Sequence, residues 1–145
     1  MHIWYTYRVR QTRKSPGSVS DLAYHLVWCP KYRKAVLTGE IAVRAEELIR
    51  AKAVENGWQI RAIEVMPDHI HVLVAADVKS SPSHIANQFK GVTSRVLRAE
   101  FRVLRSKLPT LWSRSFFVST VGAVDEETVK RYIETQYERP WRKAV

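Results

Sequence analysis

The sequence predicts an α+β fold of the ferredoxin-like (RRM-like) type, an antiparallel sheet with helices on one face plus a C-terminal helix that carries a tyrosine. Two observations predict this class. Strand-forming runs and amphipathic helical stretches follow the order strand, helix, strand, strand, helix, strand, helix, and the first six form a βαββαβ unit. In addition, a chain of 145 residues without internal repeats can bury one hydrophobic core but not two.

The first strand and the first helix end at residues that break secondary structure. Residues 22–28 are rich in strand formers, and Pro30 ends this run because proline cannot donate a hydrogen bond to a central ladder. From Glu40 onward apolar residues recur with the helical period, and Asn56-Gly57 stops the pattern.

A β-hairpin follows the first helix. Residues 58–66 alternate between apolar and polar side chains, Pro67-Asp68 makes a turn, and residues 69–75 form the second strand. Because side chains alternate across a strand, Ile70, Val72 and Val74 should pack beneath the two helices of the unit. The opposite face of the sheet is then expected to be free of helices.

The longest predicted helix begins at Ser81-Pro82-Ser83, with Ser81 or Ser83 as its N-cap, and runs to about Arg105. Its apolar residues share one face: Ile85, Phe89, Val92, Val96, Ala99 and Val103.

The last strand and the last helix complete the pattern. Residues 116–121 read as a strand that Gly122 ends, and Asp125 is placed to cap a helix running to about Glu138, before Pro140. Residues 1–20 have no hydrophobic periodicity and are predicted to be a basic arm, whereas residues 21–145 form one domain.

The composition narrows the class of function. The chain has 24 Lys+Arg against 14 Asp+Glu, a formal charge of +10, which favours a polyanionic partner such as nucleic acid, or else an acidic membrane surface. A charge that only maintains solubility is the alternative. The single cysteine, Cys29, excludes an internal disulfide framework. Neither a membrane-spanning run nor a signal peptide is evident, so a cytoplasmic location is expected.

Two histidines in the hairpin are candidate metal ligands. His69 and His71 lie two residues apart in a strand, so both project from the same face, within about 7 Å of each other. Neutral imidazole binds divalent cations, but two nitrogens require further ligands. By itself the pair is weak evidence and is more typical of surface or packing histidines.

The last helix offers a further ligand and a nucleophile. Tyr132 and Gln136 are four residues apart and share a helical face, so a glutamine carbonyl and a phenol could approach the same cation. A phenol beside a cation suggests covalent catalysis on phosphate, because the positive site favours the attacking phenolate. An amphipathic helix with a packed tyrosine is the structural alternative.

Several motifs together resemble a known family. The segment around His69-Ile70-His71 resembles the His-hydrophobic-His signature of HUH-type single-tyrosine transposases of small single-stranded-DNA insertion sequences. Further segments carry the resemblance in the same order over about residues 22–138: residues 24–33, 66–74, 89–95, 111–122 and 129–136.

The resemblance implies a function and its residues. It implies a strand transferase that cuts single-stranded DNA hairpins at element ends and rejoins them through a 5′-phosphotyrosine, with no nucleotide cofactor. By position it implies Tyr132 as the nucleophile and His69, His71 and Gln136 as ligands of Mg²⁺ or Mn²⁺. It also implies a homodimer in which the tyrosine helix of one chain completes the site of the other, and no membrane partner. The absence of a phosphate-binding Gly-rich loop in the sequence agrees with a nucleotide-free reaction.

Residues near these motifs are accessory candidates. Asp68 and Glu64 are candidates to support the metal ligands, although Asp68 is more readily explained as satisfying the backbone of its turn. His25 and His84 receive no role. The DNA-binding candidates are a basic and aromatic cluster, an arginine stripe on the long helix, and two positions taken from the resemblance: Lys31, Tyr32, Arg33 and Lys34; Arg95, Arg98, Arg102 and Arg105; Lys90 and Arg114.

Two other functions remain open from the sequence. The first is a non-catalytic module that binds single-stranded nucleic acid on the same type of sheet, although histidines stand where such modules have their aromatic pair. The second is a relaxase or replication-initiator nickase, a class that generally has larger accessory regions.

Overall fold

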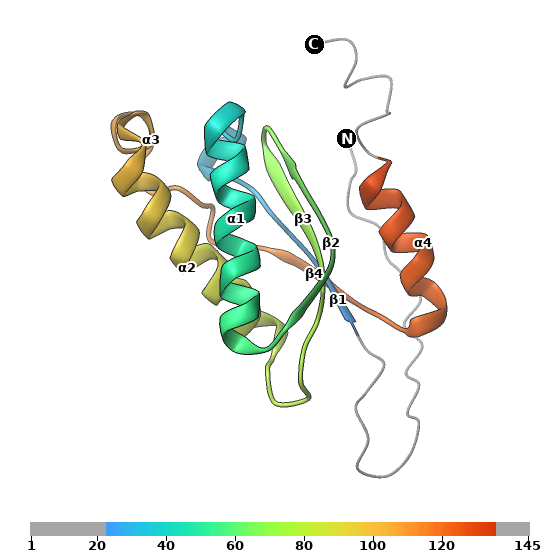
Figure 1. Cartoon of the computed structure of the whole chain (residues 1–145). Coiled ribbons are helices and arrows are strands. Elements are labelled where there is room, and N and C mark those ends of the chain that lie inside the picture. The colour runs from blue at the N-terminus through green and yellow to red at the C-terminus, as the bar shows by residue number, and fades with distance from the viewer. Residues whose placement is uncertain (1–22, 136–145) are drawn as a thin grey trace.

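The computed structural model describes residues 23–135 and has the predicted α+β architecture (Figure 1). Its elements are β1 (Ala23–Trp28), the 3-10 turn η1 (Lys31–Arg33), α1 (Gly39–Asn56), β2 (Gln59–Met66), β3 (His69–Ala75), α2 (Pro82–Glu100), α3 (Arg102–Lys107), β4 (Phe117–Val121) and α4 (Ala123–Glu134). The predicted basic arm of residues 1–20 lies outside the described residues, as does Gln136.

The four strands form one antiparallel sheet in the order β2-β3-β1-β4. This order confirms the ferredoxin-like prediction, because the two crossover connections place β1 and β3 at the centre. A bulge in β2 between Ile60 and Ala62 shifts the register against β3 and leaves Glu64 directly opposite His71.

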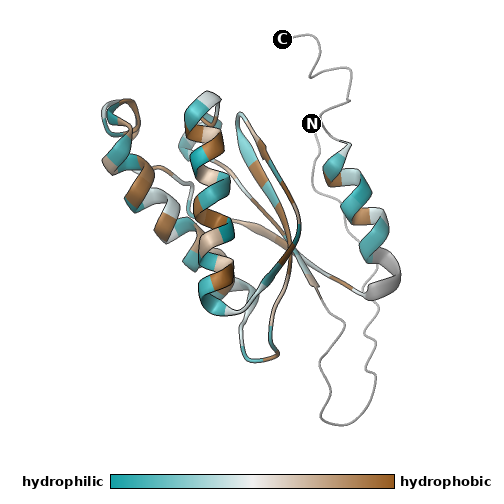
Figure 2. Cartoon of the chain, in the orientation of Figure 1, coloured by the Kyte–Doolittle hydropathy of each residue, from teal (hydrophilic) through white to brown (hydrophobic). Residues whose placement is uncertain are grey.

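One face of the sheet makes the main core beneath α1 and α2, which cover the same side (Figure 1). Leu26 and Trp28 of β1 and Ile70, Val72 and Val74 of β3 point into it and are at most 1 % exposed. Trp58 and Trp112 are also buried there. Figure 2 shows apolar and polar bands alternating along α1 and α2, as expected for helices that bury one side.

The expectation of a helix-free opposite face is wrong. α4 lies across the sheet from α1 and α2 (Figure 1) and buries Val129 and Ile133 against it. These side chains meet a small second core that includes Ala23, Ala62 and Leu73, whose small or aliphatic side chains let the helix approach. The sheet therefore has helices on both faces.

The long helix predicted to reach Arg105 is interrupted at Phe101. α2 ends at Glu100, Phe101 has an extended backbone, and α3 begins at Arg102. The break turns Leu104 into the core, whereas Val103, predicted to be on the apolar face, is 41 % exposed. Arg105 donates hydrogen bonds to the carbonyls of Arg98 and Ala99, which lie in the last turn of α2 and lack helical partners.

Helix ends follow the predicted chemistry at two of three positions. Gly57 has the left-handed conformation, with a φ of 76°, and ends α1. The Ser81 hydroxyl accepts a hydrogen bond from the His84 N–H at 3.1 Å and caps α2. The Asp125 prediction is wrong, because α4 begins at Ala123 with Gly122 as its N-cap. Among the described residues no helix is long and apolar enough to cross a membrane.

Candidate active site

His69 and His71 lie side by side on the face of the sheet that α4 partly covers. They are 2 % and 0 % exposed, with ring centroids 4.8 Å apart and ring planes at 80°. Their alternation with Ile70 and Val72, which face the main core, places both imidazoles on the same side, as predicted from the sequence.

The His69 ring is oriented by an acidic neighbour. Its Nδ1 lies 2.7 Å from Oδ1 of Asp68, and the guanidinium of Arg33 donates to Oδ2 of the same carboxylate at 3.2 Å. The hydrogen bond with His69 is the main reason why the pKa of Asp68 is below its usual value. Asp68 therefore contacts a candidate metal ligand, and the interpretation that its carboxylate serves its own turn is not supported.

The His71 ring is oriented by a histidine that sequence reasoning left without a role. Nε2 of His25 lies 3.1 Å from Nδ1 of His71, and both rings are fully buried. Burial lowers the pKa of His25 from 6.5 to about 4, so this ring is neutral near pH 7. One signal for His25 was present in the sequence: its alternation with the apolar residues of β1 puts it on the face of the histidine pair.

Tyr132 projects from α4 toward the same cluster. Its ring centroid lies 6.1 Å from that of His71, with the planes at 80°. Tyr132 is on the face of α4 that includes Val129 and Ile133, so packing of these residues against the sheet brings the phenol to the histidines. The position of Tyr132 relative to Gln136 lies outside the described residues.

The two imidazoles could bind a divalent cation, but they are only part of a ligand set. Nδ1 of each ring is already hydrogen-bonded, and Nε2 of His69 is buried without a hydrogen-bond partner among the described residues. A buried ring nitrogen in this state fits a metal ligand. Among the residues whose side chains the structure describes, no group of three His, Cys, Asp or Glu could hold a metal ion, so the two imidazoles would need at least one further ligand.

Comparisons with known proteins show the family to which the chain belongs. The family described as "Transposase IS200 like" matches residues 18–136. The chain belongs to the IS200-like transposase family. It is 34 % identical over 131 residues to the ISDra2 transposase TnpA of Deinococcus radiodurans, covering 89 % of this chain and 94 % of the relative. It is 32 % identical over 117 residues to the transposase of insertion element IS200 from Salmonella typhimurium, covering 79 % and 76 %.

Solved structures show the same fold. A crystal structure of a Deinococcus radiodurans protein assigned as a transposase superposes with a TM-score of 0.68 at 35 % identity, covering 86 % of this chain and 98 % of the other. A REP-associated tyrosine transposase bound to a REP hairpin superposes with a TM-score of 0.64, covering 91 % and 76 %, and at 15 % identity it supports the fold alone.

The basic and aromatic cluster of this IS200-like transposase adjoins the histidine site. Lys31, Tyr32, Arg33 and Lys34 follow β1, and Arg33 connects the cluster to Asp68. Tyr32 is 68 % exposed, and Lys31 Nζ lies 5.5 Å from the centre of its ring. Tyr32 and Arg33 have positive φ values of 60° and 52°, an uncommon conformation for such residues.

Lys90 is directed into the protein. Its ammonium donates to the carbonyl of Ser113 at 2.9 Å and to those of Arg114 and Ser115 at 3.4 Å. Burial lowers its pKa. These contacts fix the segment that enters β4, and they do not support the prediction that Lys90 contacts DNA.

The arginine stripe predicted on the long helix is divided by the break at Phe101. Arg95 lies on α2 and Arg102 on α3, and both are exposed. Arg98 donates to the carbonyls of Leu104 and Leu108 at 3.3 and 3.0 Å, and so holds α3 against α2. Arg114, whose carbonyl accepts from Lys90, has an exposed side chain.

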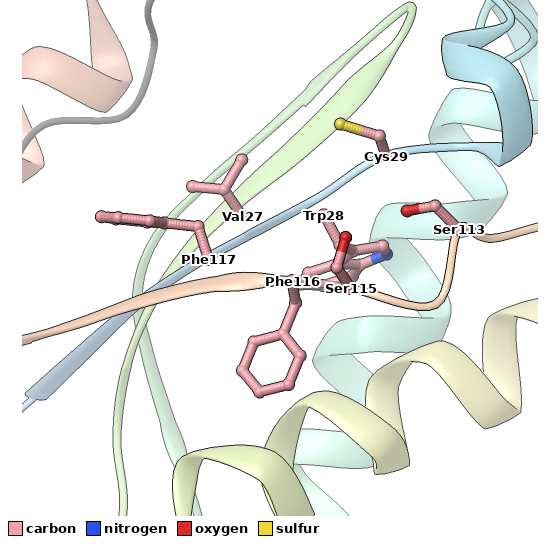
Figure 3. Close-up of a pocket in the computed structure, with 7 residues that line it drawn as sticks. All are labelled: Val27, Trp28, Cys29, Ser113, Ser115, Phe116 and Phe117. Carbon is pink, nitrogen blue, oxygen red and sulfur yellow. The ribbon is translucent and has the colours of Figure 1, made fainter.

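A pocket of about 300 Å³ lies between the end of β1 and the segment entering β4 (Figure 3). Val27 of β1 and the following Cys29 line one side of it, and Ser113 and Ser115 of the segment before β4 line the other. Burial is the main cause of the raised pKa of the Cys29 thiol, so this group is not an activated nucleophile. The pocket adjoins the histidine cluster, because Phe117 also lines it and packs its ring against His25, and Val27 pairs with His71 across the sheet.

Glu64 is the remaining accessory candidate. It lies on β2 directly opposite His71, on the same face as the histidines, because the bulge shifts the register of β2 to this pairing. The position is suitable for a group that supports His71.

Proposed function

We propose that the chain is a transposase that cleaves and rejoins single-stranded DNA at insertion-element ends through a 5′-phosphotyrosine intermediate. The proximity of the Tyr132 ring to His71 carries the proposal, because it brings a phenol to a buried histidine pair. Membership in the IS200-like transposase family supports the reaction class.

Tyr132 is the proposed nucleophile. The phenolic oxygen attacks the scissile phosphorus, a P–O bond to tyrosine forms, and the bond to the 3′ oxygen breaks with release of a 3′-hydroxyl. Rejoining reverses these events: a 3′-hydroxyl attacks the phosphotyrosine and releases the phenol. Each exchange replaces one phosphodiester bond by another, so no nucleotide cofactor is required.

His69, His71 and Gln136 are the residues proposed to hold Mg²⁺ or Mn²⁺. A cation bound there would polarise the scissile phosphate and neutralise its charge. The two imidazoles would supply their Nε2 atoms, and Asp68 keeps the His69 ring in position through Nδ1. Glu64 of β2, which lies opposite His71, is proposed to support the His71 ring.

The proposed DNA partner is a single-stranded hairpin at the element end. Lys31, Tyr32 and Lys34 adjoin the site through the Arg33–Asp68 pair, so a phosphate backbone bound by the cluster would lie near Tyr132. Exposed Arg95, Arg102 and Arg114 are proposed as further, more distant contacts.

The proposed active form is a homodimer in which α4 is exchanged. α4 is the last described element and is preceded by Gly122, so its exchange moves a single helix. An exchanged element makes in the partner the contacts that it makes in the closed chain. The packing of Val129, Ile133 and Tyr132 seen here would then describe the shared site.

A covalent-adduct assay tests the nucleophile. The DNA flanking the gene is first searched for imperfect palindromes, and single-stranded oligonucleotides from these flanks, labelled at the 3′ end, are incubated with protein and Mg²⁺ or EDTA. The native chain should give a labelled adduct that survives SDS and requires the cation, and Tyr132→Phe should give none. Tyr24→Phe is the matched control, because Tyr24 packs against the main core.

Two outcomes would contradict the proposal. An adduct formed by Tyr132→Phe would show that another group is the nucleophile. Binding without any cleavage would favour the non-catalytic single-strand-binding module instead.

A further inference from the structure

His25 is a buried side chain that contacts the proposed metal ligand His71 and has no other role in the proposed reaction. We propose that His25 is a positioning residue for His71: its Nε2 accepts the Nδ1 proton of His71, and His71 is thereby held in the tautomer whose Nε2 can bind a cation. This inference rests on the proposed function only in taking His71 as a ligand.

The geometry of the two rings supports a well-directed hydrogen bond. The planes differ by 10° and the centroids are 5.3 Å apart, whereas the Nε2···Nδ1 distance is 3.1 Å. The centroid distance exceeds the nitrogen distance by about two ring radii, one for each imidazole. This is possible only if both nitrogens lie close to the line that joins the centroids. The rings therefore meet edge to edge in nearly one plane, which directs an N–H at a nitrogen lone pair.

The chemistry of the ligand selects the direction of this hydrogen bond. A neutral imidazole has one N–H and one lone pair, and a metal ligand must offer the lone pair. Nδ1 of His71 is occupied by His25, so only Nε2 remains to bind a cation. The proton must then reside on Nδ1 of His71, and His25 is the acceptor.

The two proposed imidazole ligands are supported in the same manner. Asp68 accepts from Nδ1 of His69, and His25 accepts from Nδ1 of His71. One acceptor is a carboxylate next to the chain turn, and the other is a ring on the neighbouring central strand. A hydrogen bond to the second ring nitrogen is the usual way in which a metal-binding histidine is oriented.

The position of His25 is fixed by the sheet itself. His25 pairs with Leu73, and His71 is two residues from Leu73 on the same face, so the two histidines are diagonal neighbours across β1 and β3. Phe117 of β4 packs its ring edge against His25 on the other side, with centroids 6.3 Å apart. The ring is enclosed by the two neighbouring strands, which limits its movement.

Nitrogen NMR of the metal-free protein with ¹⁵N-labelled histidine tests the tautomer directly. At neutral pH, His71 should show a protonated Nδ1 and an unprotonated Nε2, and His25 an unprotonated Nε2. The reverse assignment, with His71 protonated on Nε2, would overturn the proposal. This measurement needs no metal and no DNA, so its outcome is independent of Tyr132.

Mn²⁺ titration of variants tests the consequence. His25→Leu removes the acceptor and should weaken Mn²⁺ binding about 10- to 100-fold, the usual cost of losing such a partner. His25→Gln keeps a carbonyl acceptor at similar reach and should recover most of the affinity. His84→Leu is the matched control, because His84 is an exposed residue of α2 whose ring packs on Trp58.

The outcomes separate this proposal from the proposed function. Unchanged Mn²⁺ affinity in His25→Leu would overturn the positioning role, and thermal unfolding of each variant shows whether the fold is retained. If His25→Leu does not fold, His25→Gln and the NMR assignment still decide. If the native chain binds no Mn²⁺, the ligand assignment on which the proposal rests is wrong.

Discussion

Nδ1 of His69 lies 2.7 Å from Oδ1 of Asp68, and the other oxygen of Asp68 accepts from Arg33 at 3.2 Å. The carboxylate therefore connects a basic, exposed segment to a buried histidine. In the tautomer with a proton on Nδ1 of His69, this hydrogen bond would leave the Nε2 lone pair for a cation. Because Arg33 also fixes Asp68, the same contact orders the segment that we propose to bind DNA.

Asp68→Ala should weaken Mn²⁺ binding by about 10- to 100-fold, because the His69 ring loses the acceptor that orients it. The cleavage rate at a fixed Mn²⁺ concentration should fall accordingly. The Mn²⁺ affinity of Asp68→Asn should lie between that of the native chain and that of Asp68→Ala. The measurement is Mn²⁺ titration followed calorimetrically. Asp77→Ala is the matched control, since Asp77 lies beyond the other end of β3 and bonds Ser80. Equal losses in both variants would show that the effect is not local.

Stability should fall in acid because His25 is buried and neutral. Between pH 6.5 and about 4 the unfolded chain binds a proton on this histidine that the folded chain does not, so the free energy of unfolding rises with pH in that window. The pKa of His25 falls from 6.5 to about 4, which corresponds to roughly 3 kcal/mol at ~1.4 kcal/mol per pH unit.

Urea unfolding of the native chain and of His25→Gln between pH 4 and 7 measures this contribution. The stability of His25→Gln should depend less on pH, because the other titrating groups are common to both proteins. Parallel curves would show that His25 does not take up a proton on unfolding. The lowered pKa of Asp68 adds a separate loss only at more acidic pH, where that carboxylate becomes protonated.

The strands and the histidine pair could be predicted because the pattern that defines them is local. Alternation in β3 assigns Ile70 and Val72 to one face and His69 and His71 to the other without knowledge of the sheet. The role of His25 could not be predicted in this way. Its partner is 46 residues away, and only the register between β1 and β3 brings them together.

The break in the long helix and the packing of α4 also depend on tertiary contacts. Phe101 is neither glycine nor proline, and the interruption is stabilised by Arg98 and Arg105, which bond main-chain carbonyls around it. No local signal marks such a site. Likewise, the pattern of Val129 and Ile133 shows that α4 buries one side, but not which face of the sheet receives it.

Lys90→Met should reduce stability without reducing DNA affinity. The substitution leaves the carbonyls of Ser113, Arg114 and Ser115 without their shared donor, which we expect to cost about 1–3 kcal/mol. Urea unfolding measures the loss, and hairpin binding at several salt concentrations gives the number of phosphate contacts. If the slope of log affinity against log salt fell by the value of about one phosphate contact while stability stayed unchanged, Lys90 would instead be identified as a DNA ligand.

Lys34→Ala should weaken hairpin binding and lower the slope of log affinity against log salt by about 0.7–0.9, as expected for the loss of one phosphate contact. Lys34 is exposed and follows Arg33, which is anchored to Asp68 beside the site. Lys79→Ala is the matched control, because this exposed lysine lies in the β3–α2 connection, beyond the opposite end of β3. Equal slopes for both variants would show that binding depends on total charge and not on this cluster.

Mixing two inactive chains should restore cleavage if α4 is exchanged between protomers. One chain carries His69→Ala and His71→Ala with an intact tyrosine, and the other carries Tyr132→Phe with intact histidines. In an exchanged dimer the tyrosine of the first chain meets the histidines of the second. Random pairing would then return about a quarter of the native number of complete sites.

A third chain supplies the control for this experiment. It carries both the histidine and the tyrosine substitutions, and its mixture with Tyr132→Phe should remain inactive because no intact tyrosine is present. In all three chains the contacts that hold α4 are unchanged: Val129, Ile133 and the ion pair between Arg61 and Glu126. If the first mixture also remains inactive while the chains form mixed dimers, each tyrosine acts on the histidines of its own chain, as α4 packs in the closed chain.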